Sequence, residues 1–182
     1  MAYRGAHLIM PTSATATGTG SSATISANGS VSFSACATLS LNGVFSADYD
    51  NYMVVLRGDC SSAANVGYRL RVGGTDNSTA NSYVYQELEA TSTTIYGGRL
   101  TSDVGRFCPF NNTQENGAIV HIYGPFLAQP TAWRSVTAND ASSARIDDYG
   151  GTHNQSTSYD GFTMIPGSGS ITGRVAVYGM RK

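Results

Sequence analysis

Apolar and polar residues alternate with a period of two along most of this chain, which predicts β-strands. The clearest case is residues 31–41, where Val31, Phe33, Leu39 and Leu41 fall in one row and Ser, Thr and Cys residues in the other. A period of two is typical of a strand with one buried face. The dipeptide Asn-Gly at 42–43 favours a turn. We therefore predict one half-buried strand over residues 31–41.

Other segments repeat the pattern. Residues 53–56 (Met-Val-Val-Leu) are apolar on both faces, which predicts a central strand. In residues 66–72, Arg69 and Arg71 share the face opposite the apolar row. Further strands are predicted at 83–90, 93–96, 105–110, 118–123 and 132–138. Residues 97–117 are otherwise unassigned, and residues 139–158 are interpreted as a polar, Gly-rich loop.

The closing stretch predicts a β-hairpin. An apolar run (Phe162, Met164, Ile165) stops at Pro166, and Gly-Ser-Gly-Ser follows at 167–170. A second run, from Ile171, places its larger apolar residues in one row. Gly-rich punctuation between two such runs is typical of a hairpin. Its second strand is expected inside the core.

With about nine or ten short strands and no convincing helix, the chain is predicted to be all-β. The expected architecture is an antiparallel β-sandwich of jelly-roll type, and a closed barrel is the alternative. Charged residues make up only 13% of the chain, and Ser, Thr, Gly and Tyr supply the polarity, which favours pleated surfaces over helices. We expect one β-sandwich domain over residues 31–182.

Residues 1–30 differ from the rest and are interpreted as an extended N-terminal arm. Residues 12–30 are a Ser/Thr/Ala/Gly-rich segment with little to bury. Ahead of Pro11 lies a short patch that could anchor the arm on a partner: Tyr3, His7, Leu8, Ile9 and Met10. A disordered terminus is the alternative.

The net charge and the lengths of the apolar runs argue against a nucleic-acid-binding protein, a membrane-spanning protein and a secreted protein. With 11 basic and 12 acidic residues the net charge is -1, which argues against a nucleic-acid-binding protein. No apolar run is long enough to cross a membrane, and the N-terminal patch is too short for a signal peptide. We expect synthesis in the cytoplasm and three free, mostly buried thiols, at Cys36, Cys60 and Cys108.

No residue set predicts catalysis, a metal or a cofactor. The histidines are His7, His121 and His153, and none has a fixed partner for nucleophilic chemistry. His121 is interpreted as a surface strand residue. The spaced acids Asp48/Asp50 and Glu87/Glu89 could flank a sugar, but they are interpreted as solvated or turn-capping side chains. Asp76 and the pair Asp147/Asp148 lack the spacing of a calcium loop.

Aromatic side chains in the expected loops and strands are the remaining functional signal. Tyrosine and tryptophan combine apolar area with a polar group, and so suit sugar stacking or a subunit interface. The candidates are Tyr83, Tyr85, Tyr96, Trp133, Tyr149 and Tyr159. The alternative is that they are half-buried aromatics of the sheets.

Four stretches resemble the small virion proteins of tailed bacteriophages, of the minor tail, tail-fibre or head-decoration type. They are 45–56 (FSADYDNYMVVL), 68–76 (YRLRVGGTD), 158–166 (SYDGFTMIP) and 171–179 (ITGRVAVYG). The resemblance covers about residues 31–182 and carries no catalytic residues. It implies a jelly-roll sandwich that assembles as a homotrimer.

These observations together lead to a functional expectation. The protein is expected to be a non-enzymatic virion protein, a tail-tip or fibre-type module anchored by its arm to other virion proteins, with a host surface glycan as a candidate ligand. One alternative is a capsid decoration or head-fibre protein docked on the major capsid protein. Another is a jelly-roll carbohydrate-active enzyme.

Overall fold

The chain folds into two packed antiparallel β-sheets, which confirms the predicted all-β sandwich. The computed structural model describes residues 5–113, 115–139 and 145–180, and these contain strands, turns and loops but no helix. No membrane-spanning helix therefore occurs among them. The strands are β1 (Ala6–Leu8), β2 (Ser13–Thr17), β3 (Ser22–Ile25), β4 (Val31–Cys36), β5 (Thr38–Asn42), β6 (Asn51–Cys60), β7 (Ala64–Val72), β8 (Thr75–Asp76), β9 (Tyr83–Thr91), β10 (Thr94–Ser102), β11 (Gly105–Phe110), β12 (Asn116–Tyr123), β13 (Thr131–Asn139), β14 (Arg145–His153), β15 (Gly161–Pro166) and β16 (Ile171–Met180).

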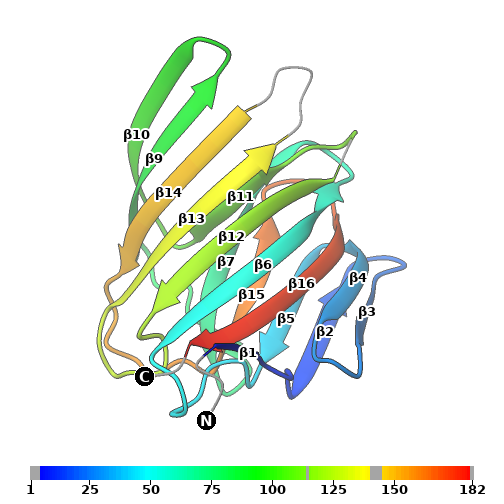
Figure 1. Cartoon of the computed structure of the whole chain (residues 1–182), viewed down its shortest axis with the longest axis vertical. Helices are drawn as coiled ribbons and strands as arrows, with labels where there is room; N and C mark the ends of the chain where they lie inside the picture. The colour runs from blue at the N-terminus through cyan, green and yellow to red at the C-terminus, as the bar shows by residue number, and fades with distance from the viewer. Residues whose placement is uncertain (1–4, 114, 140–144, 181–182) are drawn as a thin grey trace.

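The two sheets form the two layers of the sandwich (Figure 1). The ten-stranded sheet runs β10-β9-β14-β13-β12-β6-β16-β4-β3, with β1 paired to β16. The six-stranded sheet runs β11-β7-β15-β5-β2, with β8 paired to β7. Strand β6 lies between β12 and β16, so the prediction that residues 53–56 belong to a central strand is confirmed.

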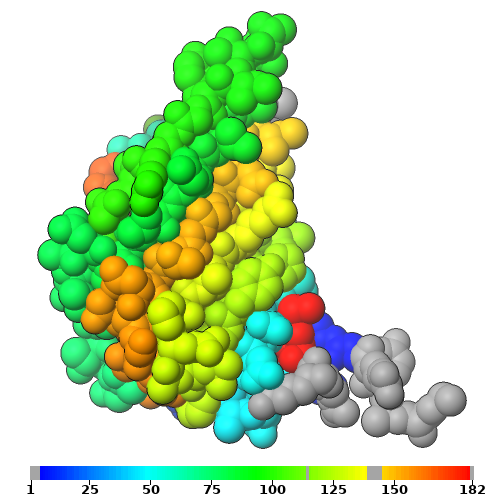
Figure 2. Space-filling model, turned by 90° about the vertical axis from the view of Figure 1, so that its left-hand side faces the viewer, coloured from blue at the N-terminus to red at the C-terminus, as the bar shows by residue number. Residues whose placement is uncertain are grey.

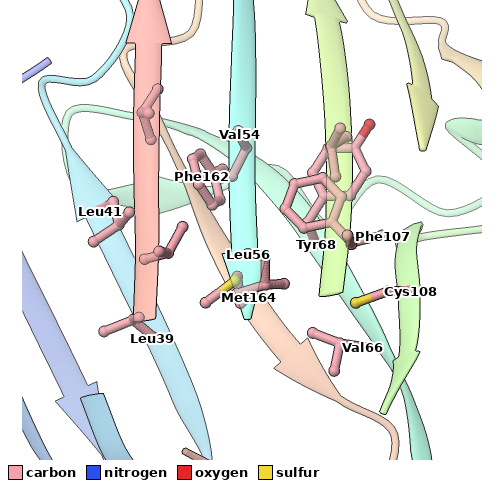
Figure 3. Packing of buried hydrophobic residues seen from close by; sticks show 14 of the residues in the cluster. Leu39, Leu41, Val54, Leu56, Val66, Tyr68, Phe107, Cys108, Phe162 and Met164 are labelled. Carbon is pink, nitrogen blue, oxygen red and sulfur yellow. The ribbon is translucent and has the colours of Figure 1, made fainter. Parts of the chain in front are cut away.

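The core lies between the sheets. Val54 and Leu56 of β6 face Phe162 and Met164 of β15, and all four side chains are buried (Figure 3). The ring of Tyr68 stacks on Phe107 with 4.2 Å between centroids. Alternate residues of each strand point inward, so each strand contributes one row of side chains to the core.

The N-terminal segment belongs to the sandwich, in contrast to the separate arm expected from its composition. Strand β1 pairs with β16, β2 pairs with β5, and β3 pairs with β4. Small side chains on these strands, such as Ala14 and Ala16, pack against the core. A strand gains backbone hydrogen bonds whatever its side chains are, so a Ser/Thr/Ala-rich segment can still form a sheet edge.

The predicted single strand over residues 31–41 is wrong. Strand β4 lies in the ten-stranded sheet and β5 in the six-stranded sheet. The chain passes from one sheet to the other at Ala37, between β4 and β5. Within β4, Ala35 has a φ of 52°, in the left-handed region that side chains other than glycine rarely adopt. The pairing of β4 with β16 shifts register between Phe33 and Cys36, so that Cys36, expected on the polar face, is buried.

The predicted C-terminal hairpin is also wrong. Strands β15 and β16 follow one another in sequence but lie in different sheets. Residues 167–170 therefore connect the two layers and do not form a hairpin turn within one sheet. The expected burial of Ile171, Val175 and Val177 in β16 is confirmed.

The sequence analysis also missed strand β14. Residues 145–153, predicted as loop, form β14 between β13 and β9. Its alternation is obscured by charged and Gly residues, because the inner row includes Asp147 and the outer row includes Asp148. Residues 94–102 and 105–110 form β10 and β11, which accounts for much of the unassigned stretch.

Candidate functional site

Five of the six candidate aromatics are buried and cannot stack on a ligand in this structure. Tyr83 and Tyr85 of β9, Trp133 of β13 and Tyr149 of β14 point into the sandwich. Trp133 lies edge-on to Tyr68 and Tyr83, and its indole Nε1 donates a hydrogen bond to the carbonyl oxygen of Arg106 at 3.2 Å.

The remaining two aromatics lie in different surroundings. Tyr159, in the loop before β15, is fully buried, and its hydroxyl accepts a hydrogen bond from Asn77 Nδ2 at 2.7 Å. Tyr96 of β10 is 57% exposed. The structure therefore does not gather the six aromatics into a platform for a sugar, and only Tyr96 presents a surface.

The candidate anchor residues lie partly outside the described residues, because Tyr3 falls in the first four. His7 and Leu8 belong to β1 and oppose Gly179 and Tyr178 of β16. Ile9 packs against the core, and its N–H donates to the carbonyl oxygen of Val177 at 2.8 Å. Met10 is half exposed. Residues 7–9 therefore belong to the sandwich itself.

A charged cluster occupies one end of the inter-sheet space. The carboxylate of Asp147 is fully buried. It accepts hydrogen bonds from Arg145 Nη2 at 2.6 Å, Thr137 Oγ1 at 3.1 Å and the Tyr149 hydroxyl at 3.2 Å. The same Arg145 Nη2 lies 3.0 Å from Glu89 Oε2. The cluster thus ties together the inner faces of β13, β14 and β9.

A second ion pair lies beside the first. Arg106 Nη1 lies 3.3 Å from Glu87 Oε2, and its guanidinium lies over the rings of Tyr85 and Tyr149, at 5.6 and 5.7 Å from their centroids. A guanidinium over an aromatic face is attracted by the ring quadrupole. Arg106 therefore fixes the edge of β11 to the inner face of the larger sheet.

A cleft of about 600 Å³ opens over these two ion pairs. The charged side chains that line it are Glu87, Glu89, Arg106 and Arg145. Each glutamate is paired with an arginine, so neither is a free carboxylate of the kind that a glycosidase acid–nucleophile pair requires. The arrangement suits a structural ion-pair network. Within the described residues no group of three metal-binding side chains occurs.

The histidines and cysteines are placed apart from nucleophilic partners. His121 lies on the outer face of β12, as predicted, stacked on Tyr123 at 6.3 Å. The thiols of Cys36, Cys60 and Cys108 are buried, and burial raises the pKa of Cys60 to about 11. A protonated, buried thiol is a poor nucleophile.

His153 was predicted in a loop but ends β14 and is fully buried. Its ring stacks on Tyr83 at 4.2 Å, and its Nε2 lies 2.7 Å from the hydroxyl of Tyr159. Burial lowers the pKa of His153 to about 4, because the charged imidazolium loses its hydration. The imidazole is therefore neutral in the folded protein near neutral pH.

This burial predicts a loss of stability in mild acid. An unfolded histidine has a pKa of about 6.5, so the unfolded chain binds the proton first as the pH falls. The contribution of neutral His153 to the free energy of unfolding is fully present above about pH 6.5 and is lost as the pH falls towards about 4. The loss between pH 7 and pH 5 is about 2 kcal/mol. Urea unfolding at both pH values tests this. His153→Gln should lose about that much less stability over the same interval, and equal losses would contradict the prediction.

The outer face of the ten-stranded sheet is a surface feature that the sequence analysis did not anticipate. Its central rows carry apolar side chains, which we call the outer apolar patch: Val55, Leu88, Ala90, Ile95, Ile119, Val136, Ala138, Ile146 and Ala176. Ile146 is 59% exposed, Leu88 57% and Ile119 46%. The signal was present in the sequence, because β12 and β13 have apolar residues in both rows.

Register explains why the patch is continuous. Val55, Ile119 and Val136 oppose one another on β6, β12 and β13. Asp148 interrupts this row, but Arg134 in the next row binds both its carboxylate oxygens, at 3.0 and 2.5 Å. The one carboxylate within the patch is thereby neutralised by a neighbour outside it.

The outer face of the six-stranded sheet is polar by contrast. Thr163 of β15 donates a hydrogen bond to Asp76 at 2.6 Å and accepts one from Arg71 at 3.1 Å. Ser40 of β5 lies 2.9 Å from the same hydroxyl, and Arg69 pairs with Asp103. The two outer faces of the sandwich therefore differ in polarity, and the apolar face is the candidate functional surface.

Comparisons of the chain with protein-family models, with curated proteins and with solved structures found no match.

Proposed function

We propose that the protein is a non-enzymatic structural subunit of a tailed-bacteriophage virion that joins the particle through the outer apolar patch. The patch carries the proposal. It extends from β10 to β16, a width of about 30 Å at the usual strand spacing. Continuous apolar surface of this kind on a soluble chain is typical of a protein–protein contact.

The partner that fits this surface is a flat, weakly charged β-sheet face of another virion protein. Sheets pack face to face at about 10 Å, with side chains interdigitating across the interface. Arg134 and His121 lie in the row next to the patch and supply part of the polar rim that such interfaces carry. The likeness of residues 45–56, 68–76, 158–166 and 171–179 to phage virion proteins supports the choice of partner class.

The chemistry of the rest of the molecule supports a structural role. Glu87 and Glu89 are held in ion pairs, the thiols are buried, and five of the six candidate aromatics lie in the core. We therefore propose neither attachment through a free N-terminal arm nor glycan binding by those aromatics.

Incorporation into particles tests the proposal. The variant Ile119→Lys places a charge in the middle of the patch, and Thr15→Lys places the same charge on the outer face of β2 in the other sheet. Both positions are solvent-exposed, so both variants should fold. We expect Ile119→Lys to be lost from purified particles and Thr15→Lys to be retained. Equal incorporation of the two variants would refute the role of the patch.

Electron microscopy of labelled particles tests the location. Labelling at the tail tip or on a fibre is the expected result, and labelling over the capsid would support the decoration alternative. Absence of label from intact particles would overturn the virion assignment itself.

A further inference from the structure

The free edge of β10 is the second feature that points to a partner, and it does so independently of the proposed function. Within the described residues, β10 pairs with β9 alone, over all nine of its residues from Thr94 to Ser102 and without a bulge. Its other edge carries no strand. The β9–β10 hairpin also extends beyond the rest of the sandwich (Figure 2).

The opposite edge of the larger sheet and the β11 edge of the smaller sheet have features that hinder pairing with another chain. Strand β3, at the opposite end of the larger sheet, has only four residues. Strand β11 has a bulge between Arg106 and Cys108, and Pro109 lacks a backbone donor. Short strands, bulges and proline are the devices by which proteins protect sheet edges. Strand β10 has none of them.

The backbone groups on the free edge can be identified from the turn. Thr91 and Thr94 close a two-residue turn at Ser92 and Thr93, and Ser92 has a φ of 55°. In such a hairpin the closing pair is hydrogen-bonded, and hydrogen-bonded and non-hydrogen-bonded pairs then alternate. The residues whose N–H and C=O groups point away from β9 are therefore Ile95, Gly97, Arg99 and Thr101.

We propose that two copies of this chain pair through β10, antiparallel about a two-fold axis at Gly98, so that their ten-stranded sheets join into one. In this register Ile95 opposes Thr101 of the other copy, and Gly97 opposes Arg99. The four outward residues of each copy then exchange about eight backbone hydrogen bonds across the axis. An isologous contact of this kind closes on itself and does not propagate into a filament.

Side-chain pairing favours this register over registers shifted along the strand. On the inner face, Tyr96 of each copy opposes Leu100 of the other copy. This pairing covers the side chain of Tyr96, which is 57% exposed in the single chain. Aromatic–aliphatic cross-strand pairs stabilise sheets. Arg99, the one charged residue of β10, faces Gly97, whereas a shift of the axis to residue 99 would set the two arginines directly opposite each other.

Molecular mass in solution is the first test. The contact is smaller than a standard interface of about 800 Å² per partner, so we expect weak association. The dimer should form at a protein concentration of about 100 µM and dissociate on dilution. Sedimentation equilibrium should give twice the mass of one chain at the higher concentration. A monomer or a trimer there would overturn the proposal, and a trimer would instead agree with the assembly implied by the resemblance to virion proteins.

Proline at an outward position separates edge pairing from other contacts. Gly97→Pro removes a donor from the free edge and leaves the bonds to β9 intact. Gly97→Ala is the matched control, since a Cβ there meets Leu88 Cδ2 at 3.6 Å, an ordinary contact. We expect the proline variant to be monomeric and the alanine variant to dimerise. Dimerisation of both, with the fold confirmed by circular dichroism, would exclude pairing through this edge.

Cross-linking tests the register without relying on the proline variant. A cysteine at position 98 lies opposite its own copy in a non-hydrogen-bonded pair, where Cα atoms are about 4.5 Å apart and a disulfide can form. Position 101 of one copy lies roughly 20 Å from position 101 of the other. Under oxidation Gly98→Cys should form a disulfide dimer and Thr101→Cys should not, and the native thiols are buried. Equal cross-linking, or none in Gly98→Cys, would refute this register.

Discussion

Replacing Trp133 with alanine is expected to lower the free energy of unfolding by about 3–5 kcal/mol. The indole is 2% exposed and lies among the rings of Tyr68, Tyr83 and Tyr85. Its removal would leave a cavity between the sheets and would free the carbonyl oxygen of Arg106 from its hydrogen bond. Urea unfolding followed by circular dichroism measures the loss.

The matched control is Tyr123→Ala. Tyr123 lies on the outer face of β12 and is 41% exposed, so its truncation should change stability by no more than about 0.5 kcal/mol. A similar loss in both variants would mean that the aromatics are not divided between core and surface in the way the structure places them.

Replacing Asp147 with alanine is expected to cost about 3 kcal/mol. The substitution removes the acceptor for Arg145, Thr137 and Tyr149 at once. Two hydroxyls would then lack an acceptor, and Arg145 would keep only its contact with Glu89. Breaking a buried ion pair on one side costs far more than the pair contributes when intact, because the partner stays desolvated.

The neighbouring aspartate provides the control. Asp148 has the same chemistry and pairs with Arg134, but it points to solvent on the opposite face of β14. Exposed ion pairs contribute about 0–1 kcal/mol, so Asp148→Ala should have a small effect. Thermal unfolding of the two variants compares them directly, and a larger loss in Asp148→Ala would contradict the assignment of faces.

The sequence predicted the strands well where one face is apolar and the other polar. Residues 66–71 show this, since Val66, Tyr68 and Leu70 are buried in the core while Arg69 and Arg71 share the opposite face. At the end of the strand the pattern fails, because Val72 is exposed, and Arg71 is buried beside Asp76. The same reasoning failed for β14, because the buried row of that strand includes a carboxylate. A buried Asp147 requires Arg145, Thr137 and Tyr149 around it, and no pattern within the strand reveals that all three converge.

Periodicity also cannot show which sheet a strand joins. Apolar residues alternate in the sequence over residues 31–41, yet the chain passes from one layer to the other at Ala37. The runs at 162–166 and 171–178 are close in sequence but bond to β5, β7, β6 and β4 and not to each other. Local pattern specifies the strand, whereas partner choice depends on contacts between distant segments.

The candidate site was the least predictable part. The sequence alone does not show whether a given Tyr, Trp or Glu side chain faces the core or solvent. The useful signal lay in β12, where Ile119 is a large apolar residue in the row opposite Val120 and Ile122, and in the outward row of Ala132, Val136 and Ala138 in β13. This pattern could have indicated the outer apolar patch.

The position of β16 constrains when this protein can fold during synthesis. The strand lies between β6 and β4 and also holds β1, so it joins segments from both ends of the described chain (Figure 1). Until residue 180 has left the ribosome, β6 has an open apolar edge, and β1, β3 and β4 have no attachment to the rest of their sheet. The strand edges of a nascent chain stay unpaired until their partner strand has been synthesised, and unpaired edges are prone to aggregation. A strong dependence of soluble yield on chaperone supply during expression follows from this topology.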